Sequence, residues 1–195
     1  MSGLGAAMAG GNPANGRKKD DFYATVDTDV TEALLQRFHF GPRKIHECAC
    51  GTGEMAEIIK AYGYEVVATD LVDRGYGAGN IDFLSLTQPA APVVITNPPF
   101  KLAQEFVEHG MRDLKLDCMA LFLKSTWFHA ACRTGFFYRL PPFLKLDLTW
   151  RVDFSGQGRP TMECSWFIWK RGHKGPSAFR PLERPRATRL ISAIK

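Results

Sequence analysis

Apolar and polar positions along the chain follow two spacings, one typical of helices and one typical of buried strands. Four apolar side chains after Thr28 repeat at helical spacing, and Thr28 can cap the helix that they predict, which runs to about residue 39. The same spacing predicts helices over 54–62 and 102–112. Short apolar runs bounded by turn residues predict strands over 44–48, 65–68, 93–96, 118–123, 144–152 and 165–170.

Strands that alternate with helices favour a parallel sheet that is covered on both faces. Polar residues with Gly and Pro separate the last two runs, as in an antiparallel pair. We therefore predict an α/β fold: a doubly wound, mostly parallel, Rossmann-like sheet with a C-terminal antiparallel strand. The 195 residues fit one domain, which we place at 21–175, between a disordered N-terminal segment (1–20) and a basic C-terminal tail (176–195).

Positive charge is concentrated at the C-terminal end. From residue 170 onward the chain carries eight basic residues and one acid, Glu183, a net charge of +7. The remainder is therefore at −2, because the whole chain has a net charge of +5. Such a tail suits contact with a polyanion, or serves as a solvated segment that keeps the protein in solution. The sequence leaves both readings open.

Location and metal content are constrained by what the sequence contains. No apolar stretch approaches the roughly 20 residues that span a bilayer, and the first residues lack a basic leader, so we expect a cytoplasmic protein. Five cysteines include no C-x-x-C pair. Cys48-x-Cys50 or His129-x-x-Cys132 could ligate a metal, but buried thiols in a reducing compartment fit these spacings better. We predict no metal.

A glycine-rich turn follows the first predicted strand. Gly51 and Gly53 permit a tight turn and close approach of the backbone to a ligand, and Ala56 lets the next helix pack near the strand. Asp70 ends the second predicted strand, where a carboxylate can accept hydrogen bonds from both hydroxyls of a ribose. The alternatives are that the glycines only form a structural turn and that Asp70 only caps a helix. Together the glycines and Asp70 favour a nucleoside ligand.

Asp82 and Phe83 lie farther along the chain, where they could receive an adenine amino group and pack against its ring. Taken alone, Phe83 is better explained as a core residue. These features would also suit NAD, so they do not select a reaction.

The sequence Asn97-Pro98-Pro99-Phe100 follows the 93–96 strand directly. A Pro-Pro pair is stiff and has no N–H to donate, so the Asn97 side-chain oxygen and the Pro98 carbonyl can be held as two fixed acceptors. Two acceptors facing one NH₂ group, with Phe100 stacked on the ring, suit methylation of an amino group. A proline-rich loop is the alternative, but the position after a Gly-rich turn and Asp70 favours chemistry.

On these residues the chain resembles the amino-methyltransferases of class I, and more narrowly the small phage and prophage DNA adenine-N6 methyltransferases. The resemblance covers about residues 21–175. Its order, with an F-Y-x-T motif before the glycine turn and the N-P-P-F motif last, is similar to that of Dam-like enzymes. The resemblance implies S-adenosylmethionine as cofactor and DNA as partner. It implies cofactor contacts from Phe22, Tyr23, Thr25, Glu47, Ala49, Gly51, Gly53, Asp70, Asp82 and Phe83, and catalysis by Asn97, Pro98, Pro99 and Phe100.

Three positions depart from the family pattern. Val26 and Cys48 stand where many relatives have proline, and Phe100 replaces the commoner tyrosine, keeping the stacking face without the hydroxyl. None of the three removes an acceptor or a cofactor contact, so we expect activity.

A stacked base cannot reach such a site, so DNA methyltransferases flip it out. Lys124 and Trp127 follow the 118–123 strand and are candidates for contact with the target, although core packing is the better explanation of Trp127. Arg159, in the 153–162 loop, could grip a phosphate, or the loop could be a plain hairpin connection. No segment is long enough for a separate recognition domain, so we expect a short or relaxed target sequence.

The functional hypothesis is methyl transfer to N6 of adenine in DNA, in the cytoplasm of the bacterial host if the chain is phage-encoded. The same motif occurs in enzymes that methylate adenine in RNA or glutamine in proteins, so these acceptors stay open. An inactive module that binds cofactor or DNA is a second alternative. An NAD oxidoreductase fits less well, because the chain is short for a second nucleotide-binding half and the N-P-P-F sequence would have no role there.

Overall fold

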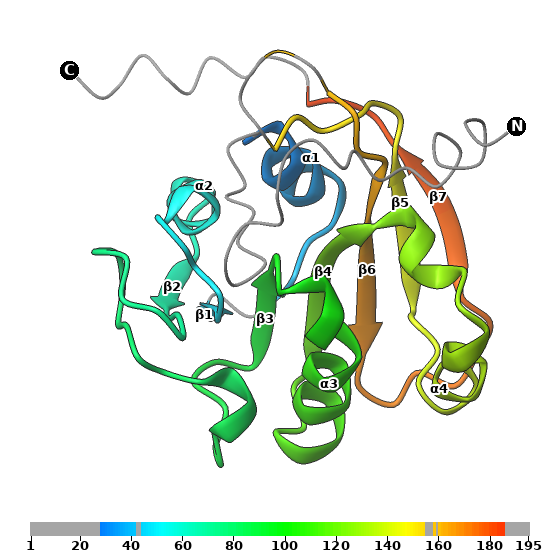
Figure 1. The fold of residues 1–195 in the computed structure, drawn as a ribbon, viewed down its shortest axis with the longest axis horizontal. Coiled ribbons are helices and arrows are strands. Elements are labelled where there is room, and N and C mark those ends of the chain that lie inside the picture. The colour runs from blue at the N-terminus through cyan, green and yellow to red at the C-terminus, as the bar shows by residue number, and fades with distance from the viewer. Residues whose placement is uncertain (1–27, 42–43, 155–157, 159, 186–195) are drawn as a thin grey trace, which may run out of the picture.

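A seven-stranded sheet organises the computed structural model, which describes residues 28–41, 44–154, 158 and 160–185 (Figure 1). The order across the sheet is β2-β1-β3-β4-β6-β5-β7. Its strands are β1 Lys44–Glu47, β2 Glu65–Ala68, β3 Val93–Thr96, β4 Cys118–Lys124, β5 Leu144–Leu148, β6 Cys164–Lys170 and β7 Ala178–Leu182.

Six strands run in one direction and β6 runs against them. The pairs β1–β2, β1–β3 and β3–β4 are parallel, β6 is antiparallel to both β4 and β5, and β7 is parallel to β5. The predicted fold class is therefore confirmed. The antiparallel strand lies inside the sheet rather than at its edge, because β6 pairs with β4 on one side and with β5 on the other. It is also not the last strand, since β7 follows it in sequence and forms the edge next to β5. The sheet thus takes in residues 178–182 of the segment that we expected to be a tail.

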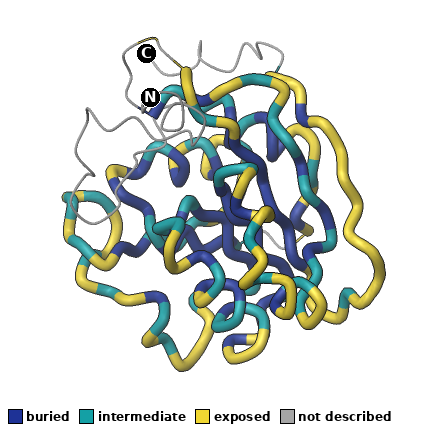
Figure 2. Tube along the Cα trace, turned by 45° about the vertical axis from the view of Figure 1, so that its right-hand side comes forward, coloured by how far each residue is buried: buried dark blue, intermediate teal, exposed yellow. Residues whose placement is uncertain are grey.

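Helices cover both faces of the sheet. On one face lie α1 (Asp29–Arg37) and α2 (Glu54–Ala61), and on the other α3 (Ala103–Glu108) and α4 (Thr134–Arg139). The alternation along β4 shows why both faces are apolar: Ala120 and Phe122 belong to the first cluster, and Met119 and Leu121 to the second, all fully buried. Figure 2 shows this buried centre ringed by exposed connections.

The predicted helix over 102–112 is shorter and irregular. It consists of α3 followed by a π-helical turn over His109–Asp113. Gly110 faces Met119 and Leu116 so closely that an added Cβ would lie 2.9 Å from the Met119 sulfur. The wider turn brings the chain close to β4 at a point where a larger residue would have to displace the Met119 and Leu116 side chains, which a spacing pattern does not reveal.

The first helix begins where we predicted and ends two residues earlier, at Arg37. Thr28 occupies the N-cap position, but its side chain makes no capping hydrogen bond. The strands at 65–68 and 93–96 have the predicted bounds. Within the described residues, no helix combines the length and the apolar character that crossing a bilayer requires.

Candidate active site

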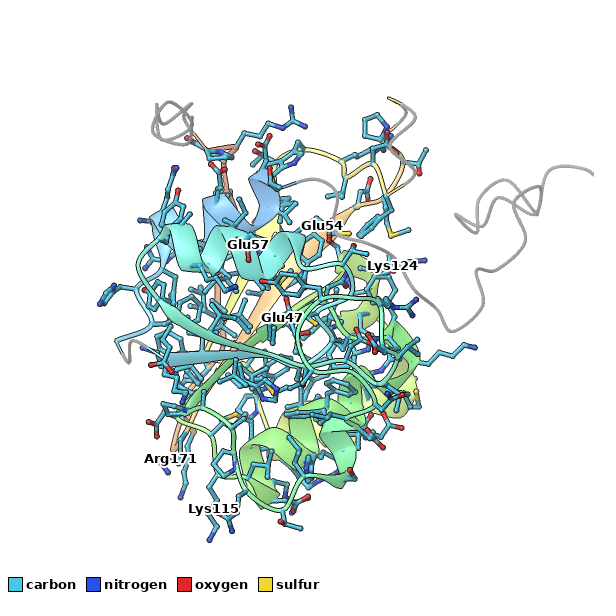
Figure 3. All side chains as sticks on the ribbon, turned by 90° about the vertical axis from the view of Figure 1, so that its left-hand side faces the viewer. Glu47, Glu54, Glu57, Lys115, Lys124 and Arg171 are labelled. Carbon is cyan, nitrogen blue, oxygen red and sulfur yellow. The ribbon has the colours of Figure 1, made fainter. Side chains whose placement is uncertain are left out.

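A cavity lies at the carboxyl ends of β1, β2 and β3, where the strand order reverses between β1 and β3. This is the place at which open α/β sheets bind ligands. Figure 3 shows Glu47 below the first turns of α2, with Glu54 and Lys124 toward the same end of the molecule and Lys115 and Arg171 at the opposite end. Nine of the predicted site residues line the cavity: Glu47, Ala49, Gly51, Asp70, Asp82, Phe83, Asn97, Pro98 and Pro99.

The glycine turn is tied to the end of β2 by Asp70. The Gly51 N–H donates to Asp70 Oδ2 at 2.8 Å, and the Val72 N–H donates to Asp70 Oδ1 at 2.9 Å. Asp70 is nearly buried and borders the cavity. A carboxylate offers about four acceptor positions, so both oxygens can still accept from a ligand hydroxyl.

Gly53 has a different role from the one we predicted. It does not border the cavity; it is the N-cap of α2, with a φ of 96°. A Cβ at this position would overlap the ring of Tyr76. Gly53 therefore makes room for Tyr76, a protein side chain, rather than for a ligand, whereas Gly51 retains its place on the cavity wall.

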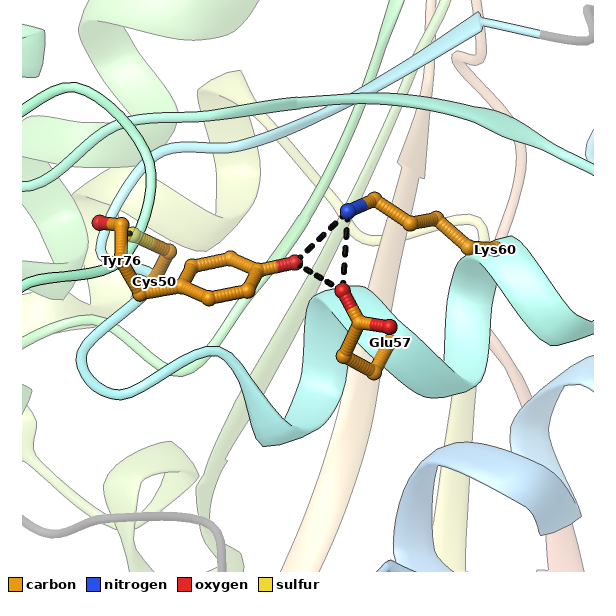
Figure 4. Close-up of polar contacts among 4 residues, drawn as sticks. All are labelled: Cys50, Glu57, Lys60 and Tyr76. Carbon is orange, nitrogen blue, oxygen red and sulfur yellow. Dashed lines mark hydrogen bonds and ion pairs between the residues drawn. The ribbon is translucent and has the colours of Figure 1, made fainter. Parts of the chain in front are cut away.

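Tyr76 fastens the loop after β2 onto α2 (Figure 4). Its hydroxyl donates to Glu57 Oε1 at 2.6 Å, and the Lys60 ammonium donates to the same oxygen at 2.8 Å and to the Tyr76 hydroxyl at 2.9 Å. These two donors lower the pKa of Glu57. The Cys50 thiol donates to the Tyr76 carbonyl at 3.5 Å. The loop that carries Leu71, Val72 and Arg74 to the cavity is thus held against the glycine turn.

Glu47 is a buried carboxyl group on the cavity wall. Its Oε1 accepts from the Thr96 hydroxyl at 2.5 Å and from the Ala49 N–H at 3.4 Å. Burial raises the pKa of Glu47 from 4.5 to about 7, and the negative charge of Asp70 adds to the rise, while the two hydrogen bonds oppose it. The group therefore changes charge near neutral pH, where a cationic ligand would favour its ionised form.

Asp82 and Phe83 also line the cavity. Asp82 caps a short 3₁₀ turn by accepting from the Leu84 N–H at 2.9 Å. Phe83 is buried and stacks on Phe106, with ring centroids 4.9 Å apart. Phe83 is thus both a core residue and part of the cavity wall, so the two alternatives weighed for it are compatible.

The Asn97-Pro98-Pro99 segment leaves β3 and borders the cavity directly. Phe100 starts the next 3₁₀ turn and does not border the cavity. The ammonium of Lys124, at the end of β4, lies 5.6 Å from the centre of the Phe100 ring. The turn after β4 is therefore close to the N-P-P-F motif, as the candidate role of Lys124 requires.

Trp127 lies in the hydrophobic core rather than on the cavity wall. It is 5% exposed and meets the rings of Phe136, Phe137 and Phe167 edge to face, and Arg133 covers its ring at 4.7 Å. Contact of Trp127 with a target base is therefore the wrong interpretation, and core packing explains the residue. Trp166 and Trp169 lie on β6 and are also buried.

Four predicted site residues lie outside the described part of the chain: Phe22, Tyr23, Thr25 and Arg159. Residues 1–20 and most of the basic tail, from 186 onward, lie outside it too.

Sequence reasoning missed the loop 71–80 as part of the site. Leu71 borders the cavity and is 62% exposed, and Arg74 borders it as well. Glycines at positions 75, 77 and 79 were the available signal, because that density in ten residues marks a tightly folded loop. Gly77 passes so close to the Ala68 carbonyl that a Cβ there would lie 2.5 Å from its oxygen.

The cysteines do not assemble into a metal site among the residues that the structure describes. No group of three or more His, Cys, Asp and Glu side chains lies together in that part of the chain. Cys48, Cys50, Cys118 and Cys164 are buried, and burial raises the pKa of the Cys50 thiol to about 12.

Comparison with known proteins gives the fold. No family model and no curated protein matches the sequence. Solved structures do: a candidate class I S-adenosylmethionine-dependent methyltransferase from Listeria monocytogenes aligns with a TM-score of 0.59 at 17% identity, over 84% of this chain and 67% of that one. A type I restriction-modification methyltransferase subunit from Streptococcus thermophilus aligns with a TM-score of 0.57 at 15% identity, over 79% of this chain and 45% of that one.

A candidate RNA methyltransferase from Pyrococcus horikoshii aligns with a TM-score of 0.50 at 12% identity, over 74% of this chain and 81% of that one. The chain spans less than half of the restriction-modification subunit. These likenesses agree with the α/β fold and its mostly parallel sheet.

Proposed function

We propose that the chain is an S-adenosylmethionine-dependent methyltransferase that modifies N6 of adenine in DNA. One observation carries the proposal: a single cavity joins the Gly51 turn and Asp70 to Asn97 and Pro98. Asp70 can then hold a nucleoside cofactor in the same cavity in which the Asn97 and Pro98 oxygens can hold the amino group of the substrate. The fold shared with class I methyltransferases supports the same assignment.

The residues present fit the cofactor. Asp70 has the acceptor capacity to hold ribose hydroxyls, and Gly51 brings the backbone to the cavity without a side chain. Asp82 and Phe83 offer an acceptor and an apolar surface for an adenine ring. Glu47 is a buried carboxyl group that changes charge near neutral pH, and the cationic end of the molecule would favour its ionised form. When bound, S-adenosylmethionine supplies a methyl group on a positively charged sulfur. Phe22, Tyr23 and Thr25 are proposed to enclose it, on the resemblance of F-Y-x-T.

Asn97 and Pro98 are proposed to hold the acceptor. The side-chain oxygen of Asn97 and the carbonyl of Pro98 each accept one hydrogen of the amino group, which fixes the nitrogen and directs its lone pair toward the methyl donor. In the transfer the amine nitrogen would form a bond to the methyl carbon as the S–C bond of the cofactor breaks with its electron pair staying on sulfur, and the nitrogen would then lose one proton to solvent. Positive charge that develops on the nitrogen is stabilised by the two oriented dipoles. Phe100, which follows these residues and lies outside the cavity, is proposed to stack on the base.

DNA is proposed as the acceptor on two grounds. One structural neighbour is named as a subunit of a restriction-modification system. The C-terminal end, from residue 170 onward, also carries a net charge of +7 against −2 for the remainder, which suits a polyanion. RNA adenine is the second candidate, because another neighbour is named as a candidate RNA methyltransferase. Lys124, beside Phe100, and Arg159 are proposed to contact the phosphate backbone of either.

The test is to incubate the purified protein with methyl-tritiated S-adenosylmethionine and, separately, with duplex DNA, total RNA and a protein mixture. We expect label in DNA, recovered as N6-methyladenine after digestion. Label in RNA alone would move the assignment to the second candidate. Absence of label in every acceptor, with cofactor binding retained, would replace the proposal with that of a binding module.

A further inference from the structure

A line of hydrogen-bonding side chains runs from β5 across β6 to Ser125, the residue that follows Lys124 at the end of β4. Asp147 on β5 lies directly opposite Ser165 on β6, and the Ser165 hydroxyl donates to Asp147 Oδ1. Ser165 and Ser125, which follows β4, have their hydroxyl oxygens 2.6 Å apart. On the far side, Lys145 forms an ion pair with Asp147 at 2.9 Å. The order is therefore Lys145, Asp147, Ser165, Ser125.

The direction of each proton along this line is fixed. An ionised carboxylate only accepts, and Asp147 is paired with an ammonium group. Ser165 has one hydroxyl proton and donates it to Asp147. The hydrogen bond between the two serines must then be donated by Ser125, although its geometry alone would allow either direction. Ser165 is fully buried, so water does not compete for these bonds.

Ser125 is consequently left as an acceptor. Its proton is committed to Ser165, and its remaining lone pairs are available on a half-buried side chain. Within the described residues, Ser165 is the hydroxyl's hydrogen-bond partner. The Ser125 backbone is also fixed, because its N–H donates to the Glu163 carbonyl at 3.0 Å.

The position of Ser125 connects this acceptor with the site. It directly follows Lys124, whose ammonium lies 5.6 Å from the Phe100 ring centre. In register, β4 runs parallel to β3, so both strands end at the same edge of the sheet. The turn Ser125–Phe128 and the segment Asn97–Phe100 therefore leave the sheet at the same edge, and Lys124 and Phe100 are in contact there.

Because the Ser125 hydroxyl can only accept a hydrogen bond, it selects a ligand group that has a proton to donate. A phosphate or a carbonyl oxygen cannot donate to it, whereas an N–H group can. Lys124 next to it has the opposite preference and suits a phosphate. A nucleic-acid strand offers both groups, phosphates along the backbone and amino groups on its bases.

We infer that Ser125 accepts a hydrogen bond from an amino group of a base in the nucleic acid bound at this site, and that Ser165 and Asp147 are positioning residues that orient its hydroxyl. The inference rests on the proposed function, since it takes a nucleic acid as the acceptor.

The experiment measures KM for adenine-containing duplex DNA, kcat, and the dissociation constant for S-adenosylmethionine in four variants. Ser125→Ala removes the acceptor, and we expect KM for DNA to rise about tenfold with cofactor affinity unchanged. Asp147→Asn keeps both serine hydroxyls, but its amide N–H can donate to Ser165. Ser165 would then donate to Ser125, and the Ser125 proton would point away from Ser165. We expect KM for DNA to rise in that variant too. Ser165→Ala frees the Ser125 proton and should give a smaller rise.

Thr126→Ala is the matched control, because Thr126 is exposed in the same turn and takes no part in the line. Melting temperatures of all variants separate loss of folding from loss of binding. The inference is overturned if Ser125→Ala and Asp147→Asn, both folded, show the KM for DNA of Thr126→Ala while the wild type methylates DNA. Failure of the proposed function gives a different result, since the wild-type protein itself would then transfer no methyl group to nucleic acid.

Discussion

The Thr96 hydroxyl at the end of β3 donates to Glu47 Oε1 at the end of β1, with 2.5 Å between the two oxygens. This bond joins the strand that carries the glycine turn to the strand that carries Asn97, across the point at which the strand order reverses. It also holds a carboxyl group in a place where water cannot solvate its charge. The ionisation of Glu47 should therefore be visible in the stability of the protein.

Burial raises the pKa of Glu47 from 4.5 to about 7, so between these pH values the folded protein holds a proton that the unfolded chain has released. The contribution of Glu47 to the free energy of unfolding should fall as the pH rises through this window, by on the order of 3 kcal/mol in total. Buried His46, whose pKa is lowered from 6.5 to about 4, contributes in the opposite direction, so the Glu47 contribution is measured as the difference between wild type and Glu47→Gln. Glu47→Gln cannot ionise and should lose this dependence. Urea unfolding of both proteins between about pH 5 and 8 measures it. Equal pH slopes in the two proteins would show that Glu47 is ionised in the fold throughout.

Asp70→Asn should weaken cofactor binding and loosen the glycine turn together. Asp70 accepts from Gly51 and Val72, and an amide in its place turns an NH₂ group toward one of these donors. We expect at least a tenfold loss of affinity for S-adenosylhomocysteine by calorimetry. Asp73→Asn is the control, since exposed Asp73 accepts from the Gly75 N–H at 3.0 Å in the same loop and does not border the cavity. Equal affinities in the two variants would remove Asp70 from the site.

Gly53→Ala should destabilise the protein through two separable effects. The φ of 96° is strained for alanine, and its methyl group would overlap Tyr76. Gly63 has a φ of 86° and nothing within 4 Å of an added Cβ. Gly63→Ala should therefore lower the free energy of unfolding by about 1 kcal/mol through backbone strain, without any steric overlap. We expect Gly53→Ala to cost about 1–3 kcal/mol more in urea unfolding. Adding Tyr76→Ala should recover part of that difference, and strict additivity of the two changes would contradict the packing described here.

The sequence predicts most of the sheet because its first strands are short apolar runs with clear ends. The runs at 65–68 and 93–96 have the predicted bounds. The last strand escapes the same reasoning: Ala178–Leu182 contains Arg180 and Pro181, and four of its five residues are exposed. Its pairing with β5 comes from the neighbouring strand rather than from its own apolar pattern, and proline is tolerated there because β7 is at the edge.

Some residues of the candidate site could likewise be predicted from the sequence, and others could not. Gly51, Asp70 and Asn97 could be found because each follows a recognisable strand, and parallel strands bring their carboxyl ends together. The role of Gly53 depends on Tyr76, 23 positions later, and the packing of Trp127 depends on rings from α4 and β6. Such long-range partners are set by the folded arrangement and leave no local pattern.

The most direct test of the account compares wild type with Asn97→Ala in two assays on the same preparation. One is transfer of tritiated methyl from S-adenosylmethionine to duplex DNA, and the other is the dissociation constant for the cofactor. Because Asn97 is proposed to hold the acceptor amine and Asp70 the cofactor, the variant should lose at least a hundredfold in kcat while its cofactor affinity stays within about twofold. Methyl transfer by Asn97→Ala at the wild-type rate would contradict the account.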